Sequence, residues 1–422
     1  MRLILIITAL LLIIFIYGYG NTAQDNCSDC HSKLGATFLE HVILPAQDVH
    51  KQRSISCANC HGGDDKIEAT LSTYKKAMDP AKGFIGTPSK QQIPGLCGKC
   101  HSNASYMRYY NPNLPIDQED QYKISQHGQL LVKGDKKIAT CIDCHDHHKI
   151  LPVNNPQSPV FPLKLALTCA KCHSNSNYMK EYGIPTDQLN KYKKSVHGIA
   201  LFEKGDTSAP VCNDCHGTHG PIQPKGNAVV NICGQCHVSN WELFMQSPHK
   251  EAFLSLEIPA CEICHSNHEI LPPTDKLIGV EKGSICTDCH TKESAGYQAA
   301  FTMRRSIDSL NQDIDKAKKA VEKARTAGME ASEQEFTLRD AQQSLTQARS
   351  YIHSFNTKQV LEKVQEGTNL ASDAYTGGLN VLKEMQTRRL GLAASIILLA
   401  VIGIILFLKI RKLPPTDTYY KH

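Results

Sequence analysis

One five-residue motif, Cys-x-x-Cys-His, occurs nine times and uses every one of the 18 cysteines in the chain. The pattern is typical of covalent haem attachment, in which two thiols bind the porphyrin and the following histidine lies under the iron. Zinc ribbons need no histidine at that position, and a disulfide framework has no reason to keep this spacing. We therefore predict nine covalently attached haem c groups. The predicted attachment cysteines are Cys27, Cys30, Cys57, Cys60, Cys97, Cys100, Cys141, Cys144, Cys169, Cys172, Cys212, Cys215, Cys233, Cys236, Cys261, Cys264, Cys286 and Cys289.

Pairs of these motifs form an internal repeat. Residues 97–150 and 169–220 are two full copies, each with an opening motif, a Ser-x-His-Gly and a closing Cys-x-x-Cys-His-x-x-His, and residues 233–270 are a shortened copy. The pair at Cys27 and Cys57 is a divergent copy, and the ninth motif stands alone. Such regular self-similarity indicates one structural unit used several times.

The haems should supply most of the core of this region. Residues 27–290 give only about 29 residues to each haem, and segments that short seldom fold without a metal or a covalent staple. We expect short helices separated by Pro- and Gly-rich loops such as residues 151–162 and 220–226. The formal charge of +5 omits the haem propionates, so it does not indicate nucleic-acid binding.

The two ends of the chain carry apolar segments. Residues 3–16 suit the apolar part of a signal peptide better than a membrane span, so residues 1–23 are predicted to be a signal peptide, with an uncleaved N-terminal anchor as the alternative. Leu390 to Leu408 are uncharged and flanked by basic residues, which predicts a transmembrane helix over residues 388–410. The tail, residues 411–422, would be cytoplasmic and the haem region, residues 24–290, would lie on the periplasmic or extracytoplasmic side of the cytoplasmic membrane.

Between the haem region and the span, residues 291–387 have the apolar heptad spacing of packed helices. The first seam runs from Met303 to Ala324, the second from Leu338 to Phe355 and the third from Leu361 through Thr368 and Tyr375 to Met385, with a break at Gly328 and an N-cap signal at Asn356. An antiparallel three-helix coiled-coil bundle accounts for this best, and one long oligomeric coiled coil is the alternative. The predicted fold class is mainly α with much irregular loop: a haem-packed domain, then the bundle, then the transmembrane helix.

The 20 histidines can be sorted by position. Nine follow the second cysteine of a motif and are predicted proximal iron ligands: His31, His61, His101, His145, His173, His216, His237, His265 and His290. His422 lies in the tail, and His147 is the surplus neighbour of His148, which aligns with the other closing histidines. Nine candidates for the sixth ligand then remain: His41, His50, His127, His148, His197, His219, His249, His268 and His353. We expect each closing histidine to serve a neighbouring haem and His353 to serve the ninth.

The nine motifs resemble those of the multihaem c-type cytochromes, from the class III group to relatives of nitrite reductase and hydroxylamine oxidoreductase. The resemblance covers Cys27 to His290 and, more loosely, the C-terminal helices with His353. It implies closely packed bis-histidine haems that conduct electrons, whereas the enzymes of the family keep one iron open. No motif has Lys in place of His, as some nitrite reductases do.

An iron with two imidazole ligands has no position for a substrate and can only change its oxidation state. The sequence therefore favours an electron-transfer protein without catalytic residues. It would connect a membrane quinol or a quinol-oxidising subunit to other cytochromes or a terminal reductase in anaerobic respiration, and the bundle could form an oligomer. The alternative is a reductase of a small nitrogen or sulfur oxyanion with one five-coordinate haem.

Overall fold

The computed structural model describes residues 25–35, 38, 42, 47–68, 70–226 and 228–413. Within these residues the regular structure is helical and contains no strand, as predicted. The predicted signal peptide, the cytoplasmic tail and His41 lie outside the described residues, apart from the first three residues of the tail.

Contacts divide the chain into two compact units. The first unit extends to Lys225 and includes His265–Pro272, and the second contains Gly226–Cys264 and the chain from Pro273 onward. This division does not follow the boundary at residue 290 that the sequence suggests. Most of the shortened copy and the ninth motif belong to the same unit as the helical bundle.

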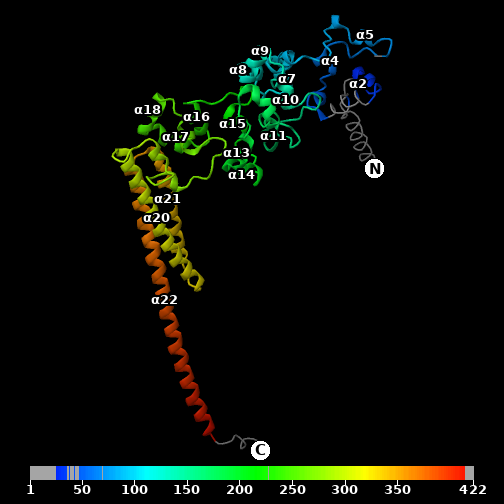
Figure 1. Cartoon of the computed structure of the whole chain (residues 1–422). Helices are drawn as coiled ribbons and strands as arrows, with labels where there is room; N and C mark the ends of the chain where they lie inside the picture. The colour runs from blue at the N-terminus through cyan, green and yellow to red at the C-terminus, as the bar shows by residue number, and fades with distance from the viewer. Residues whose placement is uncertain are drawn as a thin grey trace, which may run out of the picture. The chain divides into compact units, whose positions relative to one another are not determined.

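The first unit consists of short helices joined by loops (Figure 1). The helices that carry the motifs are α2 (Asn26–His31), α4 (Cys57–His61), α6 (Ile93–His101), α10 (Cys141–His145), α11 (Pro162–His173) and α15 (Cys212–His216). Between them lie α5 (Tyr74–Ala77), α7 (Ala104–Tyr110), α8 (Gln118–Ile124), α9 (Gln126–Val132), α12 (Ser176–Met179), α13 (Gln188–Lys194) and α14 (Val196–Phe202). The buried apolar clusters are small, with Tyr122, Leu131 and Ile138 in one and Leu201, Ala209 and Val211 in another. Clusters of this size fit a chain that takes its apolar bulk from haem.

The second unit combines short helices with three long ones. The short helices are α16 (Ala228–Gly234), α17 (Val238–Met245), α18 (Pro248–Ser255) and α19 (Ala260–His265), the last residue of which belongs to the first unit. The long helices are α20 (Ala295–Thr326), α21 (Ser332–Tyr351) and α22 (Thr357–Arg411). They form the predicted bundle, with Gly328 at positive φ between α20 and α21. Asn356 caps α22 by accepting hydrogen bonds from the backbone N–H groups of Lys358 and Gln359.

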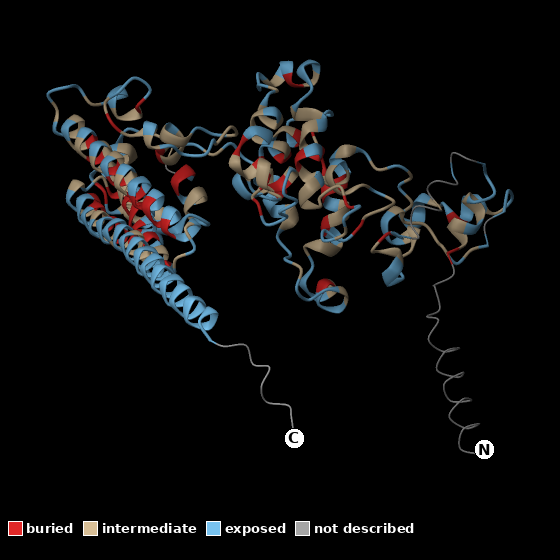
Figure 2. Cartoon of the chain, turned by 90° about the horizontal axis from the view of Figure 1, so that it is seen from below, coloured by how far each residue is buried: buried red, intermediate tan, exposed pale blue. Residues whose placement is uncertain are grey.

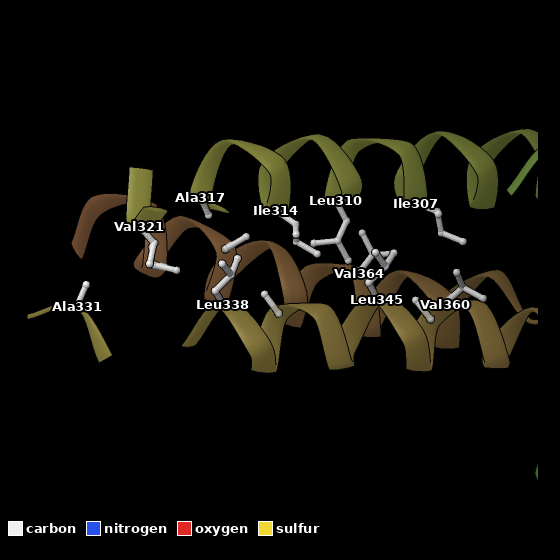
Figure 3. Close-up of a cluster of buried hydrophobic side chains, with 14 of the residues drawn as sticks. Ile307, Leu310, Ile314, Ala317, Val321, Ala331, Leu338, Leu345, Val360 and Val364 are labelled. Atoms are coloured by element: carbon white, nitrogen blue, oxygen red, sulfur yellow. The ribbon is translucent and has the colours of Figure 1, made fainter. Parts of the chain in front are cut away.

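The core of the bundle is built from small and aliphatic side chains that point into the space between the three helices (Figure 3). Ile307 and Leu310 of α20 and Val360 of α22 are fully buried there. A loop is fixed to the outside of this bundle by Asp275, whose carboxylate accepts two hydrogen bonds from Arg349, at 2.9 and 2.8 Å. Bidentate pairs of this kind are among the stronger charged contacts in proteins.

The third heptad seam was predicted one residue out of register at Leu361, Thr368 and Tyr375. Leu361 and Tyr375 were expected inside the bundle but are exposed, whereas Val360, Gly367 and Ala374 are buried. The interior of the bundle is narrow along α22, because a Cβ atom added at Gly367 would come within 2.8 Å of Leu310 Cδ2. Small residues therefore face the core, and the larger apolar ones remain at its edge.

Helix α22 continues without a break from the bundle into the predicted membrane span. Beyond the ends of α20 and α21 it runs alone (Figure 1), and this part is exposed along its whole length (Figure 2). Among the described residues it is the one helix long and apolar enough to cross a membrane, and none of its most apolar 18-residue window is buried. Apolar surface of this extent needs a bilayer or a partner to cover it.

Candidate functional site: paired histidines and cysteines

The closing motifs fold as single-turn helices that begin at the first cysteine and end at the histidine. In α10 the carboxylate of Asp143 accepts hydrogen bonds from the backbone N–H (2.7 Å) and the hydroxyl (3.0 Å) of Thr140, just before the helix. Asp214 and Asn59 accept the equivalent backbone hydrogen bonds in α15 and α4, at 2.7 and 2.8 Å. These contacts satisfy a backbone donor that the helix start would leave free. They hold two thiols and one imidazole on a single turn.

The Ser-x-His-Gly segment places its histidine at the start of another short helix. Ser125 Oγ accepts a hydrogen bond from Gly128 N at 2.9 Å and donates one to Tyr122 O at 2.6 Å. The second copy repeats this arrangement at Ser195. The glycine is required because a Cβ at Gly128 would lie 2.0 Å from Tyr122 O. The sequence shows the motif but not the reason for its glycine.

Six pairs of half-buried histidines face each other at nearly the same distance, five pairs in the first unit and one in the second. The centres of their rings are separated by 6.0 Å in His50–His101 and His61–His148, 6.2 Å in His127–His173 and His145–His219, 5.9 Å in His216–His268 and 5.8 Å in His249–His290. Each pair joins a histidine of a Cys-x-x-Cys-His motif to one of the other candidates. An iron held between two ring nitrogens at about 2 Å each separates those nitrogens by roughly 4 Å. Adding the distance from each nitrogen to its ring centre accounts for the observed spacing, so the residues fit a bis-histidine haem.

The pairs follow a rule of exchange between repeats. The histidine of a closing motif faces the last histidine of the next copy, as in His61–His148 and His145–His219. The histidine of an opening motif faces the Ser-x-His histidine of the previous copy, as in His127–His173. Closing histidines therefore lie beside motifs of a neighbouring copy.

Backbone hydrogen bonds join the same segments. In the first three copies, the residue before the middle histidine donates its N–H to a carbonyl two residues beyond the closing histidine of the next copy. These bonds are Val49 N to Ile150 O at 2.9 Å, Gln126 N to Pro221 O at 3.1 Å, and Val196 N to Ile270 O at 2.8 Å. The exchange of histidines thus rests on a regular backbone contact rather than on side chains alone.

Burial favours the neutral form of several of these histidines, and the neutral form is the one that binds a metal. The pKa of His145 is lowered to about 4, first by burial and then by the charge of His219. Burial also lowers the pKa of His127, with a further contribution from His173 facing it. The pKa of His249 is lowered in the same way, by burial and by His290.

The cysteines of successive motifs also lie together. Within a copy, the first cysteines of the opening and closing motifs share a hydrogen bond, as in Cys97–Cys141 and Cys169–Cys212, and this bond raises the pKa of Cys97 and of Cys169. The second cysteine of a closing motif lies near the opening motif of the next copy. For Cys60, burial and then the charge of Cys100 raise its pKa. Contacts within a copy therefore alternate with contacts between copies, and the motifs of the first unit follow one another in sequence order.

Among the described residues, no group of three or more His, Cys, Asp or Glu side chains could hold a metal ion directly. None of the 18 cysteines forms a disulfide. A zinc site would need about four protein ligands close together, whereas a haem iron needs two.

The remaining candidates are placed as follows. His353 lies in the single-turn 3₁₀ helix η8 (Ile352–Ser354), where its Nδ1 contacts Ser350 O at 2.9 Å. Its pKa is lowered by burial and by the charge of His237, so these two histidines lie near each other. We expected His353 to serve the ninth motif, but the ring that faces His290 is that of His249. Phe355, expected in the second seam, instead contacts His249 at 3.8 Å between ring centres.

His197 has the same local structure as His127, and His31 and His265 end the helices α2 and α19. His147, the surplus histidine, is exposed and lies beside Asp146, with 3.1 Å between Nδ1 and Oδ1. The sequence indicated that closing histidines serve neighbouring haems, but not which motif histidine each of them would face.

Paired Cys-x-x-Cys-His motifs and facing imidazoles are the features that a multihaem c-type cytochrome requires. Residues 49–174 match the family model for cytochrome c3, a family with covalently bound haem, and this stretch contains four of the nine motifs. Residues 13–70 match a family described as a protein of unknown function, DUF3716. No curated protein and no solved structure matches the chain.

Proposed function

We propose that this protein is a membrane-anchored cytochrome with nine haems that conducts electrons and has no catalytic site. The observation that carries the proposal is the set of six histidine pairs at 5.8–6.2 Å, because iron between two imidazoles is coordinatively full. The haems supply the one-electron chemistry. The chain's own residues attach them, provide both axial ligands and exclude substrate.

The ligand set follows from the exchange rule. The proximal ligands are the nine motif histidines, and six of the sixth ligands are His50, His127, His148, His219, His249 and His268. We propose His353 for a haem of the shortened copy, since it shares the environment of His237. His197 and His41 complete the set of nine by the count of histidines.

The proposed path of electrons follows the order of the motifs, since neighbouring cysteines alternate between contacts within a copy and contacts between copies. Helix α22 would fix the protein to the cytoplasmic membrane, with the haems on the periplasmic side. We propose a membrane quinol or quinol-oxidising subunit as the donor and other cytochromes or a terminal reductase as the acceptors.

Spectroscopy of the purified full-length protein tests this proposal. The haem content per chain should be nine by pyridine haemochrome assay and intact mass, and all the iron should be low-spin by electron paramagnetic resonance. The reduced protein should not bind carbon monoxide. One high-spin haem that binds carbon monoxide would overturn the proposal and indicate a reductase with an open iron.

A further inference from the structure

The first copy of the repeat has an acidic residue where the other copies have serine. The position lies two residues before the middle histidine of each copy, and its occupants are Asp48, Ser125, Ser195 and Ser247. Ser125 and Ser195 are fully buried and cap the helix that carries the histidine. The carboxylate at Asp48 is therefore a departure from the structural role of this position.

The carboxylate of Asp48 contacts the histidine itself. Its side chain is only 7% exposed, and Oδ1 accepts hydrogen bonds from His50 N at 2.8 Å and from His50 Nδ1 at 3.0 Å. The second oxygen, Oδ2, accepts a hydrogen bond from Ile150 N at 2.6 Å. All three donors are N–H groups, two from the backbone and one from the imidazole. They stabilise the buried negative charge. With its proton on Nδ1, His50 offers the lone pair of Nε2 to the iron that it would share with His101.

Other histidines of the set have weaker partners at the same nitrogen. The Nδ1 atoms of His61, His216 and His353 lie 2.8–2.9 Å from the backbone carbonyls of Gly86, Ile222 and Ser350. The Nδ1 of His249 is buried and has no hydrogen-bond partner within the described part of the chain. Of these hydrogen bonds between described residues, the one from His50 ends on a carboxylate and those from His61, His216 and His353 end on backbone carbonyls.

A carboxylate bound to the outer nitrogen of a metal-bound imidazole makes that imidazole a stronger donor. Hydrogen bonds and local charge at the axial ligand are principal controls of haem potential. A stronger donor and a nearby negative charge both stabilise ferric iron relative to ferrous iron. Each contribution lowers the reduction potential of the haem that has this ligand.

We propose that Asp48 tunes the haem attached to Cys97 and Cys100, giving it a lower reduction potential than serine at this position would. The inference rests on the proposed function, because it takes His50 and His101 as the two ligands of that haem. Asp48 is a positioning residue, since it acts on the iron through His50. An electron that moves along the haems of the first unit would reach a haem of lowered reduction potential at the third motif.

The test is a redox titration of the full-length protein, monitored by absorbance and by electron paramagnetic resonance. Asp48→Asn and Asp48→Ser should raise one midpoint potential and shift the g-values of one low-spin signal. Asp48→Glu, which keeps the carboxylate, should restore most of the wild-type value. Asp64→Asn is the matched control, since it removes a carboxylate of the same copy that pairs with Lys82 at 2.7 Å. It should leave that signal unchanged.

Unchanged midpoints and g-values in both Asp48→Asn and Asp48→Ser, with all nine haems present by mass, would overturn the inference and leave the proposed function intact. Asp48→Ser guards against misfolding, because serine occupies this position in the two full copies, where it caps the helix that carries the histidine. Loss of the haem from this variant too would also overturn the inference, since Asp48 would then only build the site. A high-spin haem in the wild-type protein would instead overturn the proposed function.

Discussion

Asp25 joins the first two motifs at the scale of a single residue. Its buried carboxylate accepts hydrogen bonds from Lys51 Nζ at 2.9 Å and from the backbone N–H groups of Cys27 and Cys57, both at 3.2 Å. Burial opposes its ionisation, but Lys51 and Cys57 outweigh that effect and lower its pKa to about 2. One ionised carboxylate therefore fixes two haem-binding turns that are 30 residues apart in the sequence.

We predict that Asp25→Asn destabilises the protein near neutral pH by about 2 kcal/mol, the free energy that corresponds to this lowered pKa. Because the folded-state pKa lies below the unfolded value, the contribution is complete above about pH 4 and is lost as the pH falls toward 2. Denaturant unfolding of the two proteins over this pH range measures the difference.

Asp29→Asn is the control for this experiment, since Asp29 is exposed on the same helix, α2. It should unfold like the wild type at every pH. A difference between wild type and Asp25→Asn that persists at pH 2, or that is absent at pH 7, would contradict the role given to the Asp25 carboxylate.

The sequence predicted the type of each motif residue better than its partners. Nine cysteine pairs followed by histidine indicate haem because the attachment chemistry needs that local spacing. His61 and His148 face each other because of contacts between copies, and local spacing does not specify those contacts. Asp48 was missed because the repeat was read through its histidines, and a carboxylate two residues before one of them has no local signature.

At the scale of single elements, α22 shows how packing selects among neighbouring residues. Heptad spacing predicted three antiparallel helices and the turn at Gly328, because an apolar stripe and a residue at positive φ are both local features. The register of the third seam was wrong at Leu361 and Tyr375. The distance between helices decides whether a large or a small side chain fits, and a single sequence does not contain that distance.

We predict that Gly378→Leu destabilises the bundle by about 1–3 kcal/mol through overpacking. A Cβ at Gly378 would lie 3.1 Å from the backbone of Ala320 and Val321, which cannot move aside as a side chain could. Thermal unfolding of the full-length protein in detergent, followed by far-ultraviolet circular dichroism, should show a lower midpoint for the bundle.

Gly391→Leu provides the matched control on the same helix. Nothing lies within 4 Å of a Cβ added at Gly391, and leucine forms helix better than glycine does. This variant should unfold at or above the wild-type temperature. Equal loss of stability in both variants would show that the substitution acts through something other than contact with α20.

At the scale of the whole molecule, the chain has one described helix that could attach it to a membrane. We predict that a chain ending at Thr387 is released into the soluble periplasmic fraction with its haems, because the apolar part of α22 is removed. Fractionation followed by haem staining measures this. Retention in the membrane would point to the N-terminal segment as an uncleaved anchor, the alternative that the sequence left open.

The unbroken course of α22 has a mechanical consequence. If the apolar part of α22 lies in lipid, as proposed, a single rod joins it to the bundle and transmits torque, so the rotation of the bundle about the helix axis is coupled to that of the membrane segment. Each residue of an α-helix turns the axis by about 100° and advances it about 1.5 Å. Adding or deleting one residue between Met385 and Leu390 would swing the face that the bundle offers to a membrane-bound donor through more than a quarter of a circle, while barely changing its height.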